Sequence, residues 1–257
     1  MIDALKQRLH ARSAAILLSL ENRLDRIMLG WLALAGLASA LRIAATPAPG
    51  IVPDLGTVAP YLLLVFAPVV SIGLALRWFA DGQRLPQPAV RLARLGAWRP
   101  LAAAEAERHE LYGASGIMVS LLIGMLLNIP VRAAEYLAAM PALSGPVPAW
   151  LATLHALMTI DVVLLSSLYA IAFVAALRRV PLFPRLLAAI WLVDLAMQLL
   201  TAQLVAGAPG LPAAVAAPLH NLLDGNVMKV LISMALWLPY LLLSRRVNVT
   251  YRHRIPA

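Results

Sequence analysis

The sequence predicts an all-α membrane protein, a polytopic bundle of about six transmembrane helices. Of its 257 residues, 62% are hydrophobic and only 13% are charged, whereas ordinary soluble domains carry about 25% charged residues. A water-soluble core of this length does not hide so much apolar surface, so the excess is expected to face lipid. The apolar residues also gather in long stretches, and the loops between them alternate between basic and nearly uncharged.

Six stretches have the roughly 20 mostly apolar residues that a helix needs to cross about 30 Å of hydrocarbon. The predicted spans cover residues 27–45, 57–76, 111–129, 148–177, 186–206 and 226–243. Three of the connecting segments, 46–56, 133–147 and 207–225, hold eight prolines in total. Because proline interrupts regular helix, these segments are predicted to be short and irregular.

The residues before the first span predict an amphipathic helix that lies on the membrane surface. Within residues 1–26, apolar side chains such as Leu5, Leu9, Ile16 and Leu20 recur near helical spacing, with basic residues between them. A cleaved secretory signal that ends near residues 38–40 is the alternative interpretation. The membrane bundle is predicted to cover residues 27–257.

The basic residues predict the orientation. Eighteen of the 21 lysines and arginines lie before the first span, between the second and third, between the fourth and fifth, or after the sixth. Cytoplasmic loops collect Lys and Arg, so both termini and the basic loop 77–110 are predicted to be cytoplasmic. Residues 101–110 of this loop are predicted to form a helix that runs into the third span. The net charge of +9 indicates anionic lipids at the cytoplasmic face as partners, and not nucleic acid.

Polar residues inside the predicted spans mark the candidate site, because charges at membrane depth are costly and usually functional. Asp161 lies midway along the fourth span, and Asp194 lies in the fifth. We expect a polar cavity or pathway between the last three helices, and its candidate residues are His155, Asp161, Asp194, Gln198, Lys229, Ser233, Trp237 and Tyr240. The alternative is that these side chains only form hydrogen bonds that hold the helices together.

Small residues recur every four positions along the third predicted span, at Gly116, Ser120, Gly124 and Asn128. Such a stripe lets a second helix backbone approach closely. We expect it to pack against another helix of the same chain, and homodimerisation through the stripe is the alternative.

The sequence carries no catalytic, metal-binding or cofactor motif. Cysteine is absent, which excludes disulfides, thiolate metal sites and thiol nucleophiles. Asp161 and Asp194 superficially resemble the aspartate pair of intramembrane proteases, but the glycine-aspartate motif of those enzymes is absent around both residues. An intramembrane enzyme is therefore the function class with least support, and no cofactor is expected.

The closing segment of the chain contains a Trp-x-Pro-Tyr motif at Trp237–Tyr240, followed by Ser-x-Arg-Val-x-x-Thr-Tyr at Ser244–Tyr251. It resembles the closing signature of a bacterial family called "domain of unknown function 2569". Weaker similarities to the family's opening helix and inner turn occur at residues 30–32 and 173–185. Members of that family are typically shorter, with about four helices, so the resemblance does not extend to the second and third spans. It implies a bacterial inner-membrane protein and no particular reaction.

Two further function classes remain open at this stage. In the first, a small solute, lipid or proton binds in, or moves through, the polar cavity between the last three helices. In the second, the chain is an accessory or scaffold subunit of a larger membrane complex. The second class requires a membrane-protein partner or a homo-oligomer.

Overall fold

The computed structural model describes residues 2–46, 54–89 and 96–257, and the side chains from residue 11 onward. Within these residues, six helices are long and apolar enough to cross a membrane. They are α2 (Leu24–Ala44), α3 (Leu55–Trp78), α5 (Met118–Ala139), α6 (Ala149–Leu177), α7 (Phe183–Ala206) and α8 (Ala213–Leu243). The predicted all-α, multi-pass membrane fold is therefore confirmed. Part of the predicted basic loop, with Arg91 and Arg94, lies outside the described residues.

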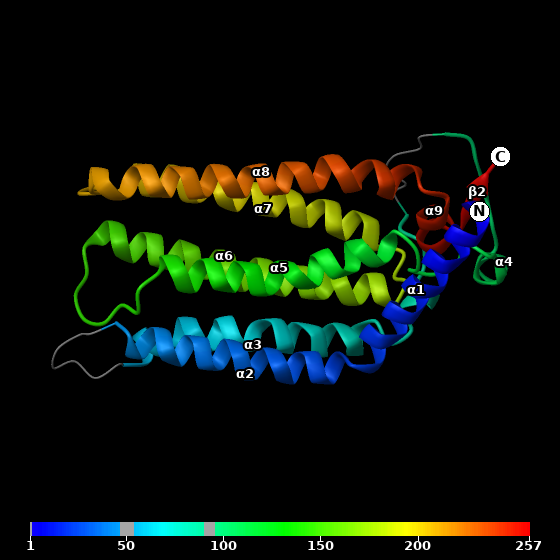
Figure 1. The fold of residues 1–257 in the computed structure, drawn as a ribbon. Helices are drawn as coiled ribbons and strands as arrows, with labels where there is room; N and C mark the ends of the chain where they lie inside the picture. Colours follow the sequence, from blue (N-terminus) through cyan, green and yellow to red (C-terminus); the bar gives the residue numbers. More distant parts are fainter. Residues whose placement is uncertain (1, 47–53, 90–95) are drawn as a thin grey trace.

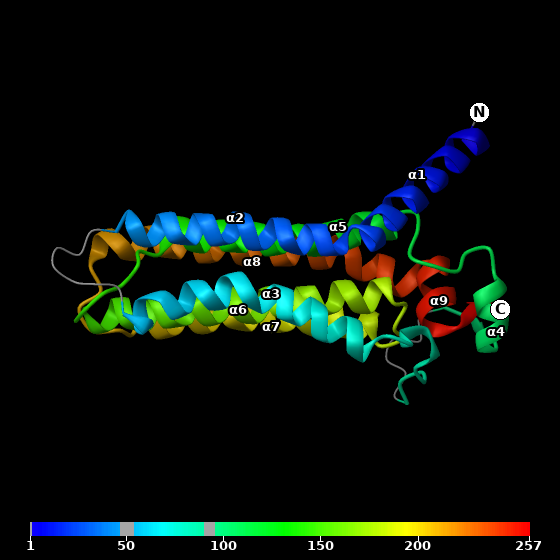
Figure 2. The ribbon, with the colours of Figure 1, turned by 90° about the horizontal axis from the view of Figure 1, so that it is seen from below.

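The six long helices form two layers of three, which Figures 1 and 2 show from two directions. One layer contains α2, α5 and α8, and the other contains α3, α6 and α7. The pairs α2/α3, α5/α6 and α7/α8 pack against each other across the layers. Each pair therefore forms a helical hairpin that contributes one helix to each layer.

Helix α6 is the centre of the bundle and packs against α3, α5 and α7. In its apolar window 67% of residues are buried, compared with 11% in α2 and 17% in α8. Its second half carries Ala170, Ala172, Ala175 and Ala176, all fully buried. Small side chains let neighbouring backbones approach, which explains why this helix accepts three partners. By contrast, α2 and α8 leave most of their apolar surface on the outside of the bundle, as lipid-facing helices do.

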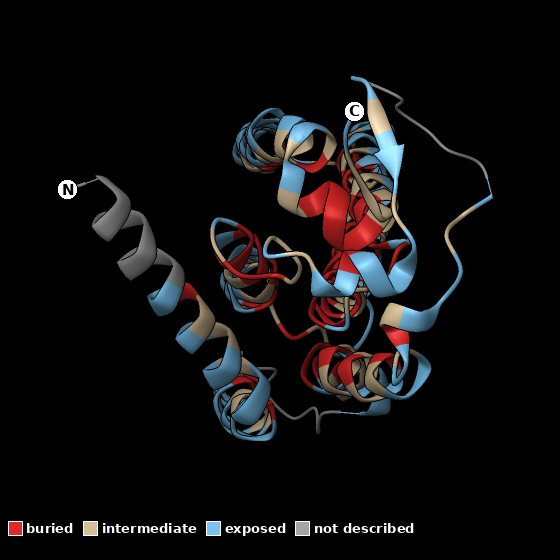
Figure 3. Cartoon of the chain, turned by 90° about the vertical axis from the view of Figure 1, so that its right-hand side faces the viewer, coloured by how far each residue is buried: buried red, intermediate tan, exposed pale blue. Residues whose placement is uncertain are grey.

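Both termini lie at the same end of the bundle, here called the terminal end (Figure 1). It carries α1 (Ile2–Asn22), the 3-10 turn Gly82–Arg84, α4 (Ala103–Arg108) and α9 (Arg245–Arg252). Strand β1 (Trp98–Pro100) pairs antiparallel with β2 (Arg254–Pro256), and Arg99 lies opposite Ile255. Figure 3 views this end, with α1 leaning away from the other helices. The surface location predicted for α1 stays a prediction.

The closing segment packs tightly against the terminal end. Residues Val247–Tyr251 of α9 are all buried. The Tyr251 hydroxyl donates to the Ala176 carbonyl at the end of α6 (2.8 Å), and its ring lies 5.0 Å from that of Phe183. Arg246 Nη1 donates to Ser115 Oγ (2.9 Å), so this arginine binds the loop before α5. The segment that resembles the family signature thus joins three parts of the chain.

The third predicted span is displaced by several residues. Helix α4 ends at Arg108, and α5 begins only at Met118, so the expected continuous helix is wrong. Gly113 and Gly116 between them have φ angles of 106° and 76°, which do not fit a right-handed helix. Helix α5 instead continues to Ala139, through half of the segment that was expected to be irregular.

The last predicted span is longer than expected. Helix α8 begins at Ala213 and includes Pro218, although its segment was expected to be irregular. Pro212 forms the N-cap of this helix. Pro218 is the sixth residue of α8, beyond the first turn whose N–H groups lack carbonyl partners, so the helix continues through it without one backbone hydrogen bond. Proline density alone therefore misplaced the start of α8.

The small-residue stripe does not pack against another helix of the chain. Gly116 precedes α5, and Ser120 and Gly124 are exposed. A Cβ atom added at Gly124 would have no neighbouring atom within 4 Å. The expected internal packing is therefore wrong, and homodimerisation through this face stays a prediction.

Candidate functional site

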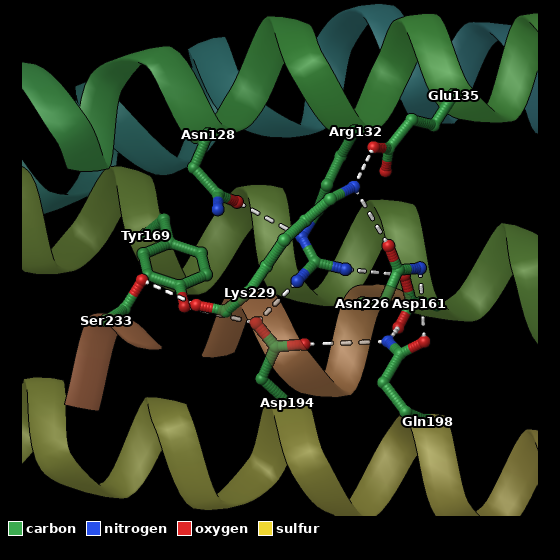
Figure 4. Close-up of polar contacts among 10 residues, drawn as sticks. All are labelled: Asn128, Arg132, Glu135, Asp161, Tyr169, Asp194, Gln198, Asn226, Lys229 and Ser233. Carbon is green, nitrogen blue, oxygen red and sulfur yellow. Dashed lines mark hydrogen bonds and ion pairs between the residues drawn. The ribbon is translucent and has the colours of Figure 1, made fainter. Parts of the chain in front are cut away.

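A buried arginine on α5 binds two aspartates from two other helices (Figure 4). Arg132 Nη1 donates to Oδ2 of Asp161 on α6 at 2.7 Å, and its Nη2 donates to Oδ2 of Asp194 on α7. The arginine and Asp161 side chains are each only 10% exposed, and Asp194 is fully buried. The planar guanidinium suits this arrangement, because its fork directs separate N–H groups at separate carboxylates.

Uncharged side chains complete the coordination of these three residues. Gln198 Nε2 donates to Asp161 Oδ1 (2.9 Å), and the Tyr169 hydroxyl donates to Asp194 Oδ2 (3.1 Å). Asn128 Oδ1 accepts from Arg132 Nε (3.0 Å). Buried charges persist in a low-dielectric interior only when they are paired and hydrogen-bonded in this way.

A second ion pair lies beside the first. Lys229 Nζ on α8 donates to Glu135 Oε1 on α5 and to Asn226 Oδ1 at 3.2 Å. Asn226 also donates to Gln198 Oε1 (3.3 Å), which connects the two ion pairs. The lysine and glutamate side chains are 59% and 30% exposed. This pair therefore forms the outer part of the cluster, and Asp194 the innermost part.

A small pocket between α5 and α8 opens onto the cluster. Its volume is about 60 Å³, and it is lined by Asn128, Val131, Arg132, Glu135, Tyr169, Asp194, Asn226, Lys229, Val230 and Ser233. A polar cavity of this size has room for a few water molecules. We call the ionisable residues Arg132, Glu135, Asp161, Asp194 and Lys229 the carboxylate cluster.

The carboxylate cluster contains more acids than bases. Asp161, Asp194 and Glu135 are three carboxylates, and Arg132 and Lys229 are two cations. When all five are ionised, the cluster has a formal charge of −1. Binding of one proton would bring this formal charge to zero. A pocket of about 60 Å³ has no room for a large solute. In the described part of the chain, no group of three or more His, Asp or Glu side chains is placed to hold a metal ion.

The structure brings together five of the eight predicted site residues. Asp161, Asp194, Gln198 and Lys229 belong to one hydrogen-bonded network, and Ser233 lines its pocket. The cavity, however, is not formed by the last three helices alone, because α5 supplies its central cation and one wall. That part of the prediction is wrong.

The other three predicted residues lie elsewhere. His155 Nε2 lies 3.2 Å from the hydroxyl of Tyr136, which is 2.8 Å from Thr159 Oγ1. These residues form a separate polar group between α5 and α6. Trp237 and Tyr240 pack edge to face with ring centroids 5.8 Å apart, and neither lines the pocket.

Sequence reasoning missed Arg132, Glu135 and Tyr169. Arg132 and Glu135 lie beyond the point where hydropathy ended the third span, because charged residues lower the average over any window. Two signals were nonetheless present. Arg132 continues the four-residue spacing that includes Gly124 and Asn128, and aspartates inside spans require a nearby cation.

No family model, curated protein or solved structure matches the chain. The resemblance of its closing segment to the "domain of unknown function 2569" family therefore stays a prediction.

Proposed function

We propose that the chain is a multi-pass protein of a bacterial inner membrane, with both termini in the cytoplasm, and that its carboxylate cluster binds and releases a proton within a transport function. The observation that carries this proposal is the excess of carboxylates over cations beside a small polar pocket at membrane depth. Ionisable groups at this depth commonly belong to proton or ion pathways.

The hydrogen bonds of the buried carboxylates favour a proton over a larger ligand. Asp161 and Asp194 already accept hydrogen bonds from Arg132, Gln198 and Tyr169. A solute or a lipid headgroup has to displace several of these bonds, whereas a proton adds no volume. Of the three ligands expected from the sequence, a small solute, a lipid or a proton, we therefore propose the proton.

Glu135 is the carboxylate best placed to exchange that proton with the surroundings. It is 30% exposed and bound to Lys229, which is 59% exposed. When a proton binds to Glu135, its negative charge is lost and the attraction to Lys229 weakens. The ammonium group of Lys229 is then held less strongly by Glu135 and attracts Asp194, deeper in the pocket, more strongly than before.

Infrared spectroscopy of the purified protein tests the proposal directly. Wild-type protein is expected to show the C=O stretching band of a protonated carboxyl group, with an intensity that depends on pH. Glu135→Gln and Asp194→Asn should each change this band. Asp224→Asn is the matched control, because Asp224 is 67% exposed and pairs with His220 outside the pocket. If no protonated carboxyl forms at any pH at which the protein stays folded, the proton function is wrong and the cluster only holds the helices together, which agrees with an accessory or scaffold subunit.

The absence of cysteine allows the water accessibility of the pocket to be measured with single substitutions. Val230→Cys and Ser233→Cys place a thiol in the pocket lining. Both are expected to react with a water-soluble thiol reagent, because the reagent attacks the thiolate, which forms only where water is present. Leu192→Cys is the control, since Leu192 is an exposed apolar residue of α7 and faces lipid in this proposal. Equal reactivity at all three positions contradicts a specific aqueous pocket.

The same approach tests the orientation. A reagent that does not cross the inner membrane should label Ala208→Cys, between α7 and α8, in intact cells. It should label Ala89→Cys, in the basic loop, only after the cells are permeabilised. The reverse pattern overturns the proposed orientation without affecting the proton proposal.

A further inference from the structure

A second pocket lies at the terminal end, away from the carboxylate cluster. It has a volume of about 40 Å³ and is lined by three arginines, one glutamine and three prolines: Arg185, Arg252, Arg254, Gln87, Pro88, Pro181 and Pro184. These residues come from the loop after α3, the turn into α7 with its first residues, and the end of α9 with the chain beyond it. We call it the arginine pocket. Its lining contains three positive charges and no carboxylate.

The sequence explains why no aspartate or glutamate neutralises this pocket. Three segments build it, and none of them contains an acidic residue over the ranges 82–104, 162–193 and 225–257. Acids occur close to both ends of the first range, at Asp81 and Glu105, but not inside it. The three segments that line the pocket therefore supply only positive charge to it.

A buried asparagine holds two of the arginines in place. Asn248 is fully buried, and its Nδ2 donates to the carbonyls of Leu242 (3.0 Å) and Ser244 (2.9 Å). Its Oδ1 accepts from Arg252 Nη1 (3.0 Å) and from Arg254 Nε (2.6 Å). One amide group thus positions two guanidinium groups, which are pre-organised in the way that binding sites require.

Other contacts fix the same two side chains. Arg252 Nη1 also donates to the Leu241 carbonyl (2.7 Å), which caps the end of α8. The Arg254 guanidinium lies 4.9 Å from the ring centroid of Trp98 on β1. These side chains are therefore parts of a built structure and not free surface residues.

Arg185, Arg252 and Arg254 line one pocket and repel one another. Burial, and then the neighbouring charges of Arg254 and Arg185, lower the pKa of Arg252 to about 10. The start of α7 adds to the positive potential, because Arg185 lies in its first turn and the amino end of a helix carries a partial positive charge. An anion in the pocket would relieve this repulsion.

We propose that the arginine pocket binds a phosphate group. Guanidinium forks match phosphate oxygens in geometry and charge, and a volume of about 40 Å³ suits one small anionic group. Pro184 and Arg185 bring the first turn of α7 into the pocket lining, and in the proposed membrane orientation this end of α7 meets the lipid headgroups. The phosphate therefore belongs either to a phospholipid headgroup or to a soluble phosphate compound. This site does not depend on the proton function of the carboxylate cluster.

Thermal unfolding of the purified full-length protein in detergent tests the proposal, with two probes. The first is inorganic phosphate, compared with chloride at equal ionic strength. The second is phosphatidic acid, compared with phosphatidylcholine. Arg185→Gln removes one pocket charge, and Arg245→Gln is the matched control, because Arg245 is an exposed residue of α9 outside the pocket lining. Arg252→Lys keeps the positive charge at the end of α8 and replaces the forked guanidinium group with a single ammonium group.

Wild-type protein should be stabilised by at least one phosphate probe over its comparison. Arg185→Gln should weaken that apparent affinity about tenfold or more, the effect expected for losing one charged hydrogen bond. Arg245→Gln should leave it nearly unchanged, and Arg252→Lys should weaken it less than Arg185→Gln. Stabilisation by inorganic phosphate identifies a soluble ligand, and stabilisation by phosphatidic acid alone identifies a lipid. No selective stabilisation by either probe, or equal losses in Arg185→Gln and Arg245→Gln, overturns the proposal.

Discussion

Arg132 Nη1 on α5 lies 2.7 Å from Asp161 Oδ2 on α6, inside a region where both side chains are only 10% exposed. The same guanidinium binds Asp194 on α7. One side chain therefore connects three helices and both layers of the bundle. Variants that lack this side chain measure its contribution to stability separately from the proton chemistry of the pocket.

Arg132→Gln is expected to destabilise the protein by about 3–5 kcal/mol, because it leaves two buried carboxylates without their shared cation. Thermal and denaturant-induced unfolding in detergent measure this loss. The triple variant that adds Asp161→Asn and Asp194→Asn should recover most of it, since no unpaired charge then remains. If Arg132→Gln alone is as stable as wild type, the two aspartates are stabilised by water and not by their ion pairs with Arg132.

Tyr251→Phe is expected to lower the free energy of unfolding by about 1 kcal/mol, the typical net value of one hydrogen bond. It removes the buried bond to the Ala176 carbonyl and keeps the ring contact with Phe183. Tyr61→Phe is the control, because the buried Tyr61 hydroxyl has no hydrogen-bond partner among the described residues. Denaturation curves of both variants should show a loss only for Tyr251→Phe. Equal losses would mean that the bond to α6 does not hold the closing segment.

His253→Asn is expected to reduce the loss of stability at low pH. Burial lowers the pKa of His253 from its ordinary value of 6.5, and Glu107 opposes this shift only in part. Because the unfolded chain binds the proton more tightly, this residue favours folding above about pH 6.5 and loses that contribution as the pH falls towards its folded-state pKa. Asparagine accepts the left-handed backbone of this position, where φ is 46°.

Unfolding temperatures between about pH 5 and 8 measure this effect. The difference between wild type and His253→Asn should grow in favour of the variant as the pH falls. A His253→Asn profile parallel to that of wild type would exclude burial of this imidazole as a cause of acid instability.

Gly82→Ala and Gly124→Ala form a matched pair with opposite expectations. At Gly82 a Cβ would lie 2.8 Å from both the Arg178 carbonyl oxygen and Val180 Cγ2, so the variant should lose about 1–3 kcal/mol through overpacking. At Gly124 a Cβ would meet nothing within 4 Å, so alanine should be neutral or slightly stabilising. The unfolding temperatures of the two variants, compared with wild type, test both expectations. A clear loss at Gly124 would instead indicate that a second copy of the chain packs on this face.

Helix positions were predictable from the sequence wherever a long apolar run coincides with the helix. The ends of α2, α3, α6 and α7 lie within a few residues of the predicted limits, because crossing a bilayer requires a run of apolar residues that is visible along the chain. Asp161 and Asp194 were identifiable for the same reason, since an aspartate inside such a run is conspicuous. The extent of α5 was not predictable, because its second half carries Arg132 and Glu135.

The sequence by itself determined the class of the protein, its six apolar helices and the two aspartates that need partners. Only the tertiary structure decided which partners they have and where a pocket forms. The physical reason is that the cost of a buried charge depends on the groups within a few ångströms of it. Arg132 is unfavourable in an isolated apolar helix and favourable between Asp161 and Asp194, and no property of α5 alone distinguishes these cases. The arginine pocket follows the same rule, because Arg185 and Arg252 are far apart in the chain and come together only where α9 packs against the start of α7.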